Sequence, residues 1–179
     1  MSPDPRLGSR PVGRIIYSEA DIARRVEELG REITTAYPVG DLVLVGLLKG
    51  SVFFLTDLAR SIRRPLKLDF LVANSYGQGK ASSGVVRVQY EPAIPLTGRH
   101  ILVVEDIIDS GRTLGFLLDR LRSAGAESLA VCALLDKRLA APPPELRFVG
   151  FAAPPVFLVG YGLDHAEEFR HLPYIAEVD

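Results

Sequence analysis

The stretch VVEDIIDSGRT, residues 103–113, determines how the rest of the chain is interpreted. Its apolar beginning predicts a strand that ends in Glu105 and Asp106, and the small residues after Asp109 predict a turn into a helix. A strand, a turn and a helix N-terminus in this order present backbone N–H groups and a positive dipole end to an anion. We therefore expect a phosphate-binding loop at this point of the chain.

The residue types of this loop suit a phosphorylated ligand. Ser110 and Thr113 offer hydroxyl donors, and Gly111 allows a ligand to approach the backbone closely. The three carboxylates fit sugar hydroxyls, or a ligand whose phosphates are covered by Mg²⁺. A surface turn in which Asp109 or Ser110 only caps the helix would explain one acidic residue but not three.

Outward from the loop, short apolar runs alternate with helical patterns. The runs at 42–48, 66–72, 100–104 and 128–135 predict buried strands, with further strands at 85–90, 146–151, 156–159 and 174–178. Helical spacing predicts helices from a Ser18 cap to Pro38, over 52–62 and over 111–124. This alternation predicts an α/β fold with a mainly parallel twisted sheet flanked by helices, and ligands at the carboxyl ends of its strands.

Length and composition exclude several classes of protein. The 179 residues correspond to one domain, and 47% apolar content excludes a disordered chain. Because 21 basic residues face 22 acidic ones, we expect no nucleic-acid partner. The single cysteine, Cys132, excludes an internal disulfide and predicts a buried, inert thiol. The N-terminus has no signal-peptide pattern and no apolar run spans a bilayer, so we expect a soluble cytoplasmic protein without membrane contact.

Several motifs, taken in their order along the chain, carry a family resemblance. The loop resembles the phosphoribosyl-pyrophosphate (PRPP) loop of the type I phosphoribosyltransferases. LLKGSVFF (47–54), NSYG (74–77), LLDKR (134–138) and VGYGLDHAEEFR (159–170) narrow the resemblance to the hypoxanthine-guanine phosphoribosyltransferase family. It covers about residues 17–178. It implies a type I phosphoribosyltransferase fold as a single domain over 1–179, with a core at about 36–140 and a small hood from about 1–17 and 145–179.

The resemblance implies a PRPP site and a lid. The residues implied to contact PRPP are Lys49, Gly50, Glu105, Asp106, Asp109, Ser110, Gly111, Arg112, Thr113 and Arg170. Asp164 is implied to reach Mg²⁺ on the pyrophosphate group, with Glu105 and Asp106 as further candidates. Ser75 and Tyr76 are implied to belong to a mobile lid. The Lys49–Gly50 bond is a candidate cis peptide; without the resemblance, Lys49 would be an exposed residue at a strand end.

The resemblance also implies how a purine is recognised. Lys137 is implied to donate to O6 of a 6-oxopurine, and an ammonium selects against adenine because it cannot accept a hydrogen bond. Phe157 is implied to stack on the base and the carbonyl of Leu158 to accept from it, while Asp109 acts as general acid/base near N7. On residue type alone, a lysine such as Lys137 is more often a solvated charge, and an aromatic such as Phe157 is usually a core residue.

The expected activity is a purine-salvage reaction. The resemblance implies Mg²⁺-dependent transfer of the 5-phosphoribosyl group from PRPP to N9 of hypoxanthine or guanine by a pentosyltransferase, which we expect to form a homodimer or homotetramer. Three alternatives stay open: a transferase that prefers xanthine, an RNA-binding regulator with a PRPP-type fold, and a nucleotide-binding protein without activity.

Overall fold

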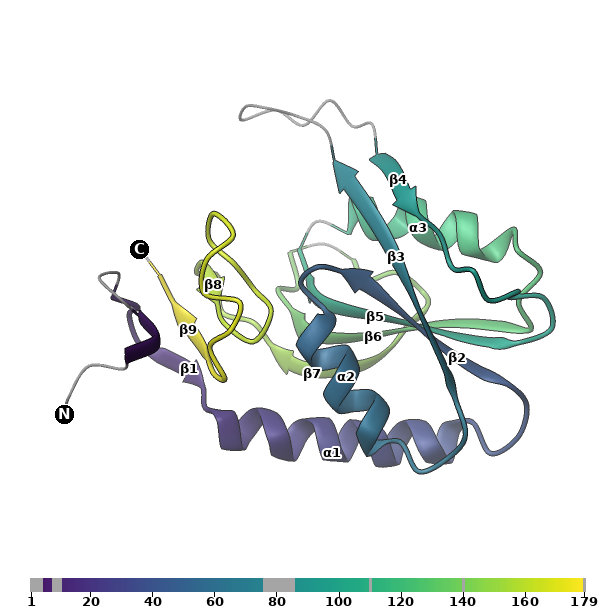
Figure 1. Cartoon of the computed structure of the whole chain (residues 1–179), viewed down its shortest axis with the longest axis horizontal. Coiled ribbons are helices and arrows are strands. Elements are labelled where there is room, and N and C mark those ends of the chain that lie inside the picture. Colours follow the sequence, from purple (N-terminus) through teal and green to yellow (C-terminus); the bar gives the residue numbers. More distant parts are fainter. Residues whose placement is uncertain (1–4, 8–10, 76–85, 110, 140, 179) are drawn as a thin grey trace.

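Two β-sheets of unequal size organise the chain (Figure 1), and the computed structural model describes residues 5–7, 11–75, 86–109, 111–139 and 141–178. A short 3₁₀ helix spans Pro5–Leu7. The helices are α1 (Glu19–Ala36), α2 (Val52–Ser61) and α3 (Arg112–Arg122). The strands are β1 (Ile15–Tyr17), β2 (Leu42–Leu48), β3 (Lys67–Ser75), β4 (Val86–Tyr90), β5 (His100–Ile108), β6 (Ser128–Asp136), β7 (Leu146–Ala152), β8 (Leu158–Val159) and β9 (Ile175–Glu177).

The large sheet has the strand order β4-β3-β2-β5-β6-β7, and every pair in it is parallel except β3 with β4. The small sheet, with the order β1-β9-β8, is antiparallel and stands beside the large sheet (Figure 1). The predicted α/β class with a mainly parallel sheet is confirmed.

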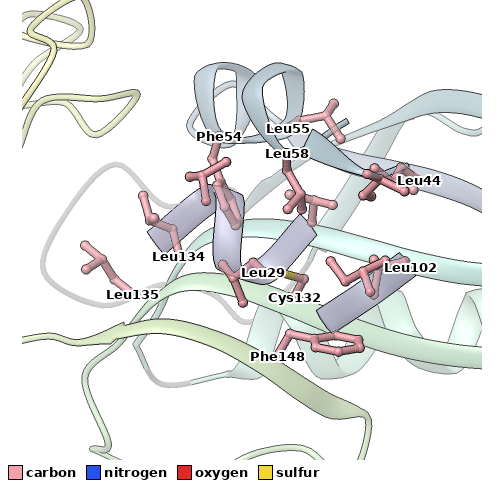
Figure 2. Packing of buried hydrophobic residues seen from close by; sticks show 14 of the residues in the cluster. Leu29, Leu44, Phe54, Leu55, Leu58, Leu102, Cys132, Leu134, Leu135 and Phe148 are labelled. Atoms are coloured by element: carbon pink, nitrogen blue, oxygen red, sulfur yellow. The ribbon is translucent and has the colours of Figure 1, made fainter. Parts of the chain in front are cut away.

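Helices cover both faces of the large sheet because its central strands are apolar on both sides. Leu44 of β2 packs in a cluster with α1 and α2, whereas its neighbours Val43 and Val45 pack in a second cluster with α3. Figure 2 shows the first cluster, in which Cys132 lies among leucines. Burial raises the pKa of the Cys132 thiol, in accordance with the inert side chain that was expected.

The N-terminus of α1 follows the predicted cap. The hydroxyl of Ser18 accepts from the backbone N–H of Asp21, and the Asp21 carboxylate accepts from the backbone N–H of Ser18. This reciprocal pair satisfies donors that the first helical turn leaves without partners. The cap fixes where the chain leaves β1 and begins to cover the large sheet.

Several expected boundaries were wrong. β5 continues to Ile108, past the expected end at the carboxylates, because Ile107 and Ile108 keep pairing with Leu135 and Asp136 of β6. The helix after the loop begins at Arg112, since Gly111 has φ 70° and acts as its N-cap. β7 falls in the range expected for the hood, yet it pairs with β6 and buries Phe148 in the main core.

The small sheet is joined to the rest by shared apolar packing. Leu158, Tyr161, Leu163 and Ile175 belong to the same buried cluster as α1 and α2. The segment between β8 and β9 is thereby held against the carboxyl ends of the large sheet's strands. Within the described residues, no helix is both long enough and apolar enough to cross a membrane.

Candidate active site

Three neighbouring parallel strands bring most of the predicted site residues to one edge of the large sheet. β2 pairs with β5, and β5 pairs with β6, all in the same direction. The carboxyl end of β2 leads to Lys49, β5 carries Glu105 and leads to Asp109, and β6 leads to Lys137. Loops that follow such strands are where open α/β sheets bind ligands.

Close backbone approaches join three segments at this edge. A Cβ atom at Gly50 would lie 1.7 Å from Oδ2 of Asp106, and a Cβ atom at Gly162 would lie 1.9 Å from the carbonyl oxygen of Gly50. A side chain at position 162 would meet the backbone of Gly50, and Gly162 also has φ 103°, whereas a side chain at position 50 would require the Asp106 carboxylate to shift. The cis peptide bond is Leu48–Lys49, one residue before the expected Lys49–Gly50 bond.

Glu105 and Asp106 are carboxyl groups withdrawn from water. Burial raises the pKa of Asp106 to about 6, although its Oδ1 accepts from the backbone N–H of Ile107 at 2.9 Å. Burial also raises the pKa of Glu105 well above its usual value, and the neighbouring Asp106 adds to that shift. Oε2 of Glu105 is buried without a hydrogen-bond partner in the described structure. Buried polar atoms of this kind call for a partner such as a ligand hydroxyl.

A small cavity lies at the turn from β5 into α3. It has a volume of about 140 Å³ and is lined by Glu105, Ile107, Ile108, Asp109, Gly111, Thr113 and Leu114. A second cavity of about 120 Å³ continues past Gly50, Glu105, Asp106 and Thr113. Both cavities border Thr113 in the first turn of α3, where the sequence predicts a phosphate.

Lys137 and Asp109 lie side by side in the ligand-free structure. Nζ of Lys137 is 3.3 Å from Oδ2 of Asp109. The backbone segments that carry the two side chains are held side by side, because the backbone N–H of Lys137 donates to the carbonyl of Ile108. The side chain predicted to read the base and the one predicted to move a proton thus share one corner of the site.

The segment around β8 supplies an aromatic ring. Phe157, just before β8, is 53% exposed, whereas Leu158 is buried. The ring of Phe157 lies 5.4 Å from the imidazole of His165, with the rings tilted by 57°. An exposed phenylalanine next to a buried strand offers a face for stacking rather than a core contact.

The turn after β8 brings a cation and an acid together. Nη2 of Arg170 lies 2.7 Å from Oδ1 of Asp164, and its Nη1 donates to the carbonyl of Gly162 at 2.7 Å. Arg170 also lowers the pKa of Asp106, which burial otherwise raises. The charge of Arg170 therefore acts on the carboxylates at the end of β5.

Some expected positions fall where little or nothing is described. Ser110 and Tyr76 lie outside the described residues, and Ser75 closes β3 with only its backbone described. Arg112 opens α3, and its side chain is likewise not described. The predicted lid therefore stays a prediction.

Two further residues enter the site without having been singled out by their sequence pattern. Oε2 of Glu167 lies 3.1 Å from Nζ of Lys49 and 3.4 Å from Nη2 of Arg170. The hydroxyl of Tyr161 donates to Oδ2 of Asp57 in α2 at 2.7 Å. Both residues belong to the VGYGLDHAEEFR motif, but only a tertiary structure shows what they face.

A larger cavity, of about 650 Å³, lies between α1, α2 and the segment before β9. Its lining includes Phe53, Asp57, Tyr161 and His171, but none of the predicted site residues. The predicted site is therefore indicated by perturbed carboxyl groups at strand ends and not by the volume of this cavity.

Comparisons with known proteins show which family the chain belongs to. A family model described as phosphoribosyl transferase domain matches residues 14–166. Hypoxanthine phosphoribosyltransferase of Salmonella typhimurium is 44% identical over 169 residues, which are 92% of this chain and 94% of that protein. The bifunctional protein TilS/HprT of Listeria monocytogenes is 43% identical over 165 residues, but the chain spans only 26% of its length.

A solved structure shows the same fold. The hypoxanthine-guanine phosphoribosyltransferase of Bacillus anthracis, crystallised with HEPES in its active site, superposes with a TM-score of 0.87 at 38% identity. The match covers 94% of this chain and 100% of that one. The chain therefore belongs to the type I phosphoribosyltransferases and, within them, to the hypoxanthine-guanine phosphoribosyltransferase family.

Proposed function

We propose that this protein transfers the 5-phosphoribosyl group of PRPP to N9 of hypoxanthine or guanine, giving IMP or GMP and pyrophosphate. The observation that carries the proposal is the distance of 3.3 Å between Lys137 and Asp109. In the tautomer that carries its proton on N7, a 6-oxopurine presents O6 as an acceptor and N7–H as a donor on one edge, so an adjacent ammonium and carboxylate match that edge. Adenine offers a donor at position 6 and meets the Lys137 ammonium unfavourably.

PRPP is proposed to bind along the end of β5. Its 5′-phosphate occupies the cavity at Asp109, Gly111 and Thr113, where the N-terminus of α3 supplies N–H donors. Ser110 and Arg112 belong to the same loop by sequence. The ribose hydroxyls meet Glu105 and Asp106, whose burial without enough partners is relieved by hydroxyl donors.

The pyrophosphate group is proposed to lie between Lys49–Gly50 and Arg170. Both cations lie next to the same acid, Glu167, which puts them within reach of one anion. The guanidinium group of Arg170 matches phosphate oxygens in geometry and charge. The bond from C1′ to pyrophosphate breaks as N9 of the purine forms its bond to C1′, and the purine proton passes from N7 to Asp109.

Phe157 and Leu158 are proposed to hold the base for this attack. The exposed ring of Phe157 stacks on the purine, and the backbone carbonyl of Leu158 accepts from a purine N–H or the guanine amino group. Stacking is sequence-tolerant, so discrimination at position 6 rests with Lys137.

Mg²⁺ is proposed to accompany PRPP. In the described part of the chain no three metal-binding side chains converge, but Mg²⁺ on a phosphorylated substrate needs only one or two protein carboxylates. Asp164, with Asp106 and Glu105 as neighbours, supplies carboxylate oxygens of the kind that Mg²⁺ prefers, and these residues fit the ion. When bound, the ion neutralises the charge of the departing pyrophosphate.

A turnover assay tests the proposal. Purified protein with PRPP, hypoxanthine and Mg²⁺ is expected to form IMP and pyrophosphate in a 1:1 ratio, and chelation of the metal with EDTA is expected to stop the reaction. Absence of IMP under these conditions contradicts the proposal and favours a nucleotide-binding protein without activity. Salt-dependent affinity for RNA, measured on the same preparation, would favour a regulator. The cytoplasmic location, the lid at Ser75 and Tyr76 and the homodimer or homotetramer stay predictions.

A further inference from the structure

Glu167 places a carboxylate oxygen between the two cations proposed to bind pyrophosphate. Its Oε2 lies 3.1 Å from Nζ of Lys49 and 3.4 Å from Nη2 of Arg170. The two cations come from segments more than a hundred residues apart in sequence. A single oxygen that two cations share has the charge and the position that a phosphate oxygen would have.

The contacts of Arg170 do not depend on Glu167. Its guanidinium group is held by Asp164 at 2.7 Å and by the carbonyl of Gly162, also at 2.7 Å. The Arg170 side chain is only 22% exposed, whereas the Glu167 side chain is 64% exposed. Glu167 is therefore the more exposed partner of this ion pair, and its side chain can turn into solvent without releasing the arginine.

Glu167 is also ionised at neutral pH. The hydrogen bond from Lys49 lowers the pKa of its carboxyl group, and the charges of Lys49 and Arg170 lower it further. Its carboxylate thus competes with other anions for the same two cations. Because the Glu167 and Lys49 side chains are both well exposed, their ion pair is weak and exchangeable.

We propose that Glu167 is a built-in anion that competes with pyrophosphate for Lys49 and Arg170 and is displaced from these two cations when pyrophosphate or PRPP binds. This inference rests on the proposed function, because it takes Lys49 and Arg170 to be pyrophosphate-binding residues. Glu167 acts through these two cations and is a positioning residue rather than a catalytic one. It pairs with both cations and thereby weakens the binding of the ligand that replaces it.

The test compares Glu167→Gln with Glu168→Gln. Both variants remove one negative charge from the same turn, so a long-range electrostatic effect on the affinity for pyrophosphate would appear in both. Isothermal titration calorimetry with inorganic pyrophosphate and Mg²⁺ is expected to show about 3–10-fold tighter binding for Glu167→Gln, which is the scale of one or two exposed ion pairs. Glu168→Gln is expected to bind pyrophosphate within about twofold of the unsubstituted protein.

IMP provides a second readout. It carries the base and the 5′-phosphate but no pyrophosphate, so its affinity is expected to be the same in Glu167→Gln and in the unsubstituted protein. Unchanged or weaker pyrophosphate binding in Glu167→Gln overturns the inference, and so does an equal gain in Glu168→Gln. A failure of the proposed function looks different, because the unsubstituted protein would then neither bind pyrophosphate nor form IMP, and the inference would fall with it.

Discussion

At the scale of single residues, the site places carboxyl groups where burial makes them costly. Burial raises the pKa of both Asp106 and Glu105, and a Cβ atom at Gly50 would lie 1.7 Å from Oδ2 of Asp106. Asp109, by contrast, remains accessible beside Lys137. Such a division suits buried groups that hold a ligand and an accessible group that exchanges a proton.

Asp109→Asn tests the proton-transfer role. The amide keeps the size of the side chain but cannot accept a proton, so kcat for IMP formation is expected to fall by about 10²–10⁴-fold. The free energy of unfolding and the affinity for PRPP are expected to change little. Asp119→Asn, on the exposed side of α3, is the matched control and should keep full turnover. Near-normal turnover in Asp109→Asn contradicts the assignment.

Asp106→Asn tests the cost of burying its carboxyl group. Because the folded pKa is raised to about 6 from 3.8, the native state holds a proton that the unfolded chain has lost between these pH values. Stability of the ligand-free protein is therefore lost as pH rises through this window, by at most about 3 kcal/mol.

The variant cannot ionise, so its stability gain over the unsubstituted protein is expected to grow from pH 4 to pH 7. Urea unfolding in EDTA at several pH values measures it. Asp41→Asn is the control, because Lys67 lowers the pKa of Asp41 and removing that carboxylate should bring no such gain. A gain that does not depend on pH would show that Asp106 is not a strained carboxyl group.

At the scale of elements, the segment between β8 and β9 is anchored to the helix that follows the Lys49–Gly50 loop. The hydroxyl of the buried Tyr161 donates to Asp57 of α2, and Gly162 packs against the carbonyl of Gly50. One hydrogen bond and one close backbone approach thus set the distance between the two halves of the proposed pyrophosphate site. The hydrogen bond from Tyr161 to Asp57 could not be predicted from the sequence, because the two residues are 104 positions apart.

Tyr161→Phe is expected to loosen this anchor. Loss of the hydrogen bond should lower the free energy of unfolding by about 1 kcal/mol or more, since Asp57 is left without its partner. The KM for PRPP should rise, because Arg170 and Gly162 are carried by the released segment. Tyr17→Phe removes another hydroxyl, one that donates to Ala152, and should lower stability without changing the KM for PRPP. An unchanged KM in Tyr161→Phe contradicts the positioning role.

At the scale of the whole molecule, hydrophobic periodicity and the alternation of apolar runs with helical patterns predicted most of the architecture. The buried runs became β2, β5 and β6 because their apolar residues face helices on both sides of the sheet. The ends of the strands were harder to predict. Glu105 and Asp106 suggest the end of a strand, but β5 continues past them because it keeps pairing with β6. The assignment of β7 to the large sheet likewise depends on tertiary packing of Phe148.

The site shows the same division. The loop from Asp109 to Thr113 has a local pattern with a physical reason, so it was predictable from residues alone. Lys137, Phe157 and Arg170 carry no such pattern, and the family resemblance was needed to single them out. Glu167 and Tyr161 were missed because their meaning lies in contacts with Lys49 and Asp57, which sequence spacing does not encode.

A competition assay shows directly whether this site transfers a phosphoribosyl group to a 6-oxopurine. Equal concentrations of hypoxanthine, guanine, xanthine and adenine are offered together with PRPP and Mg²⁺, and the nucleotides formed are separated and counted. We expect IMP and GMP as the main products and essentially no AMP. Preferential formation of AMP, or of the xanthine nucleotide, would contradict it.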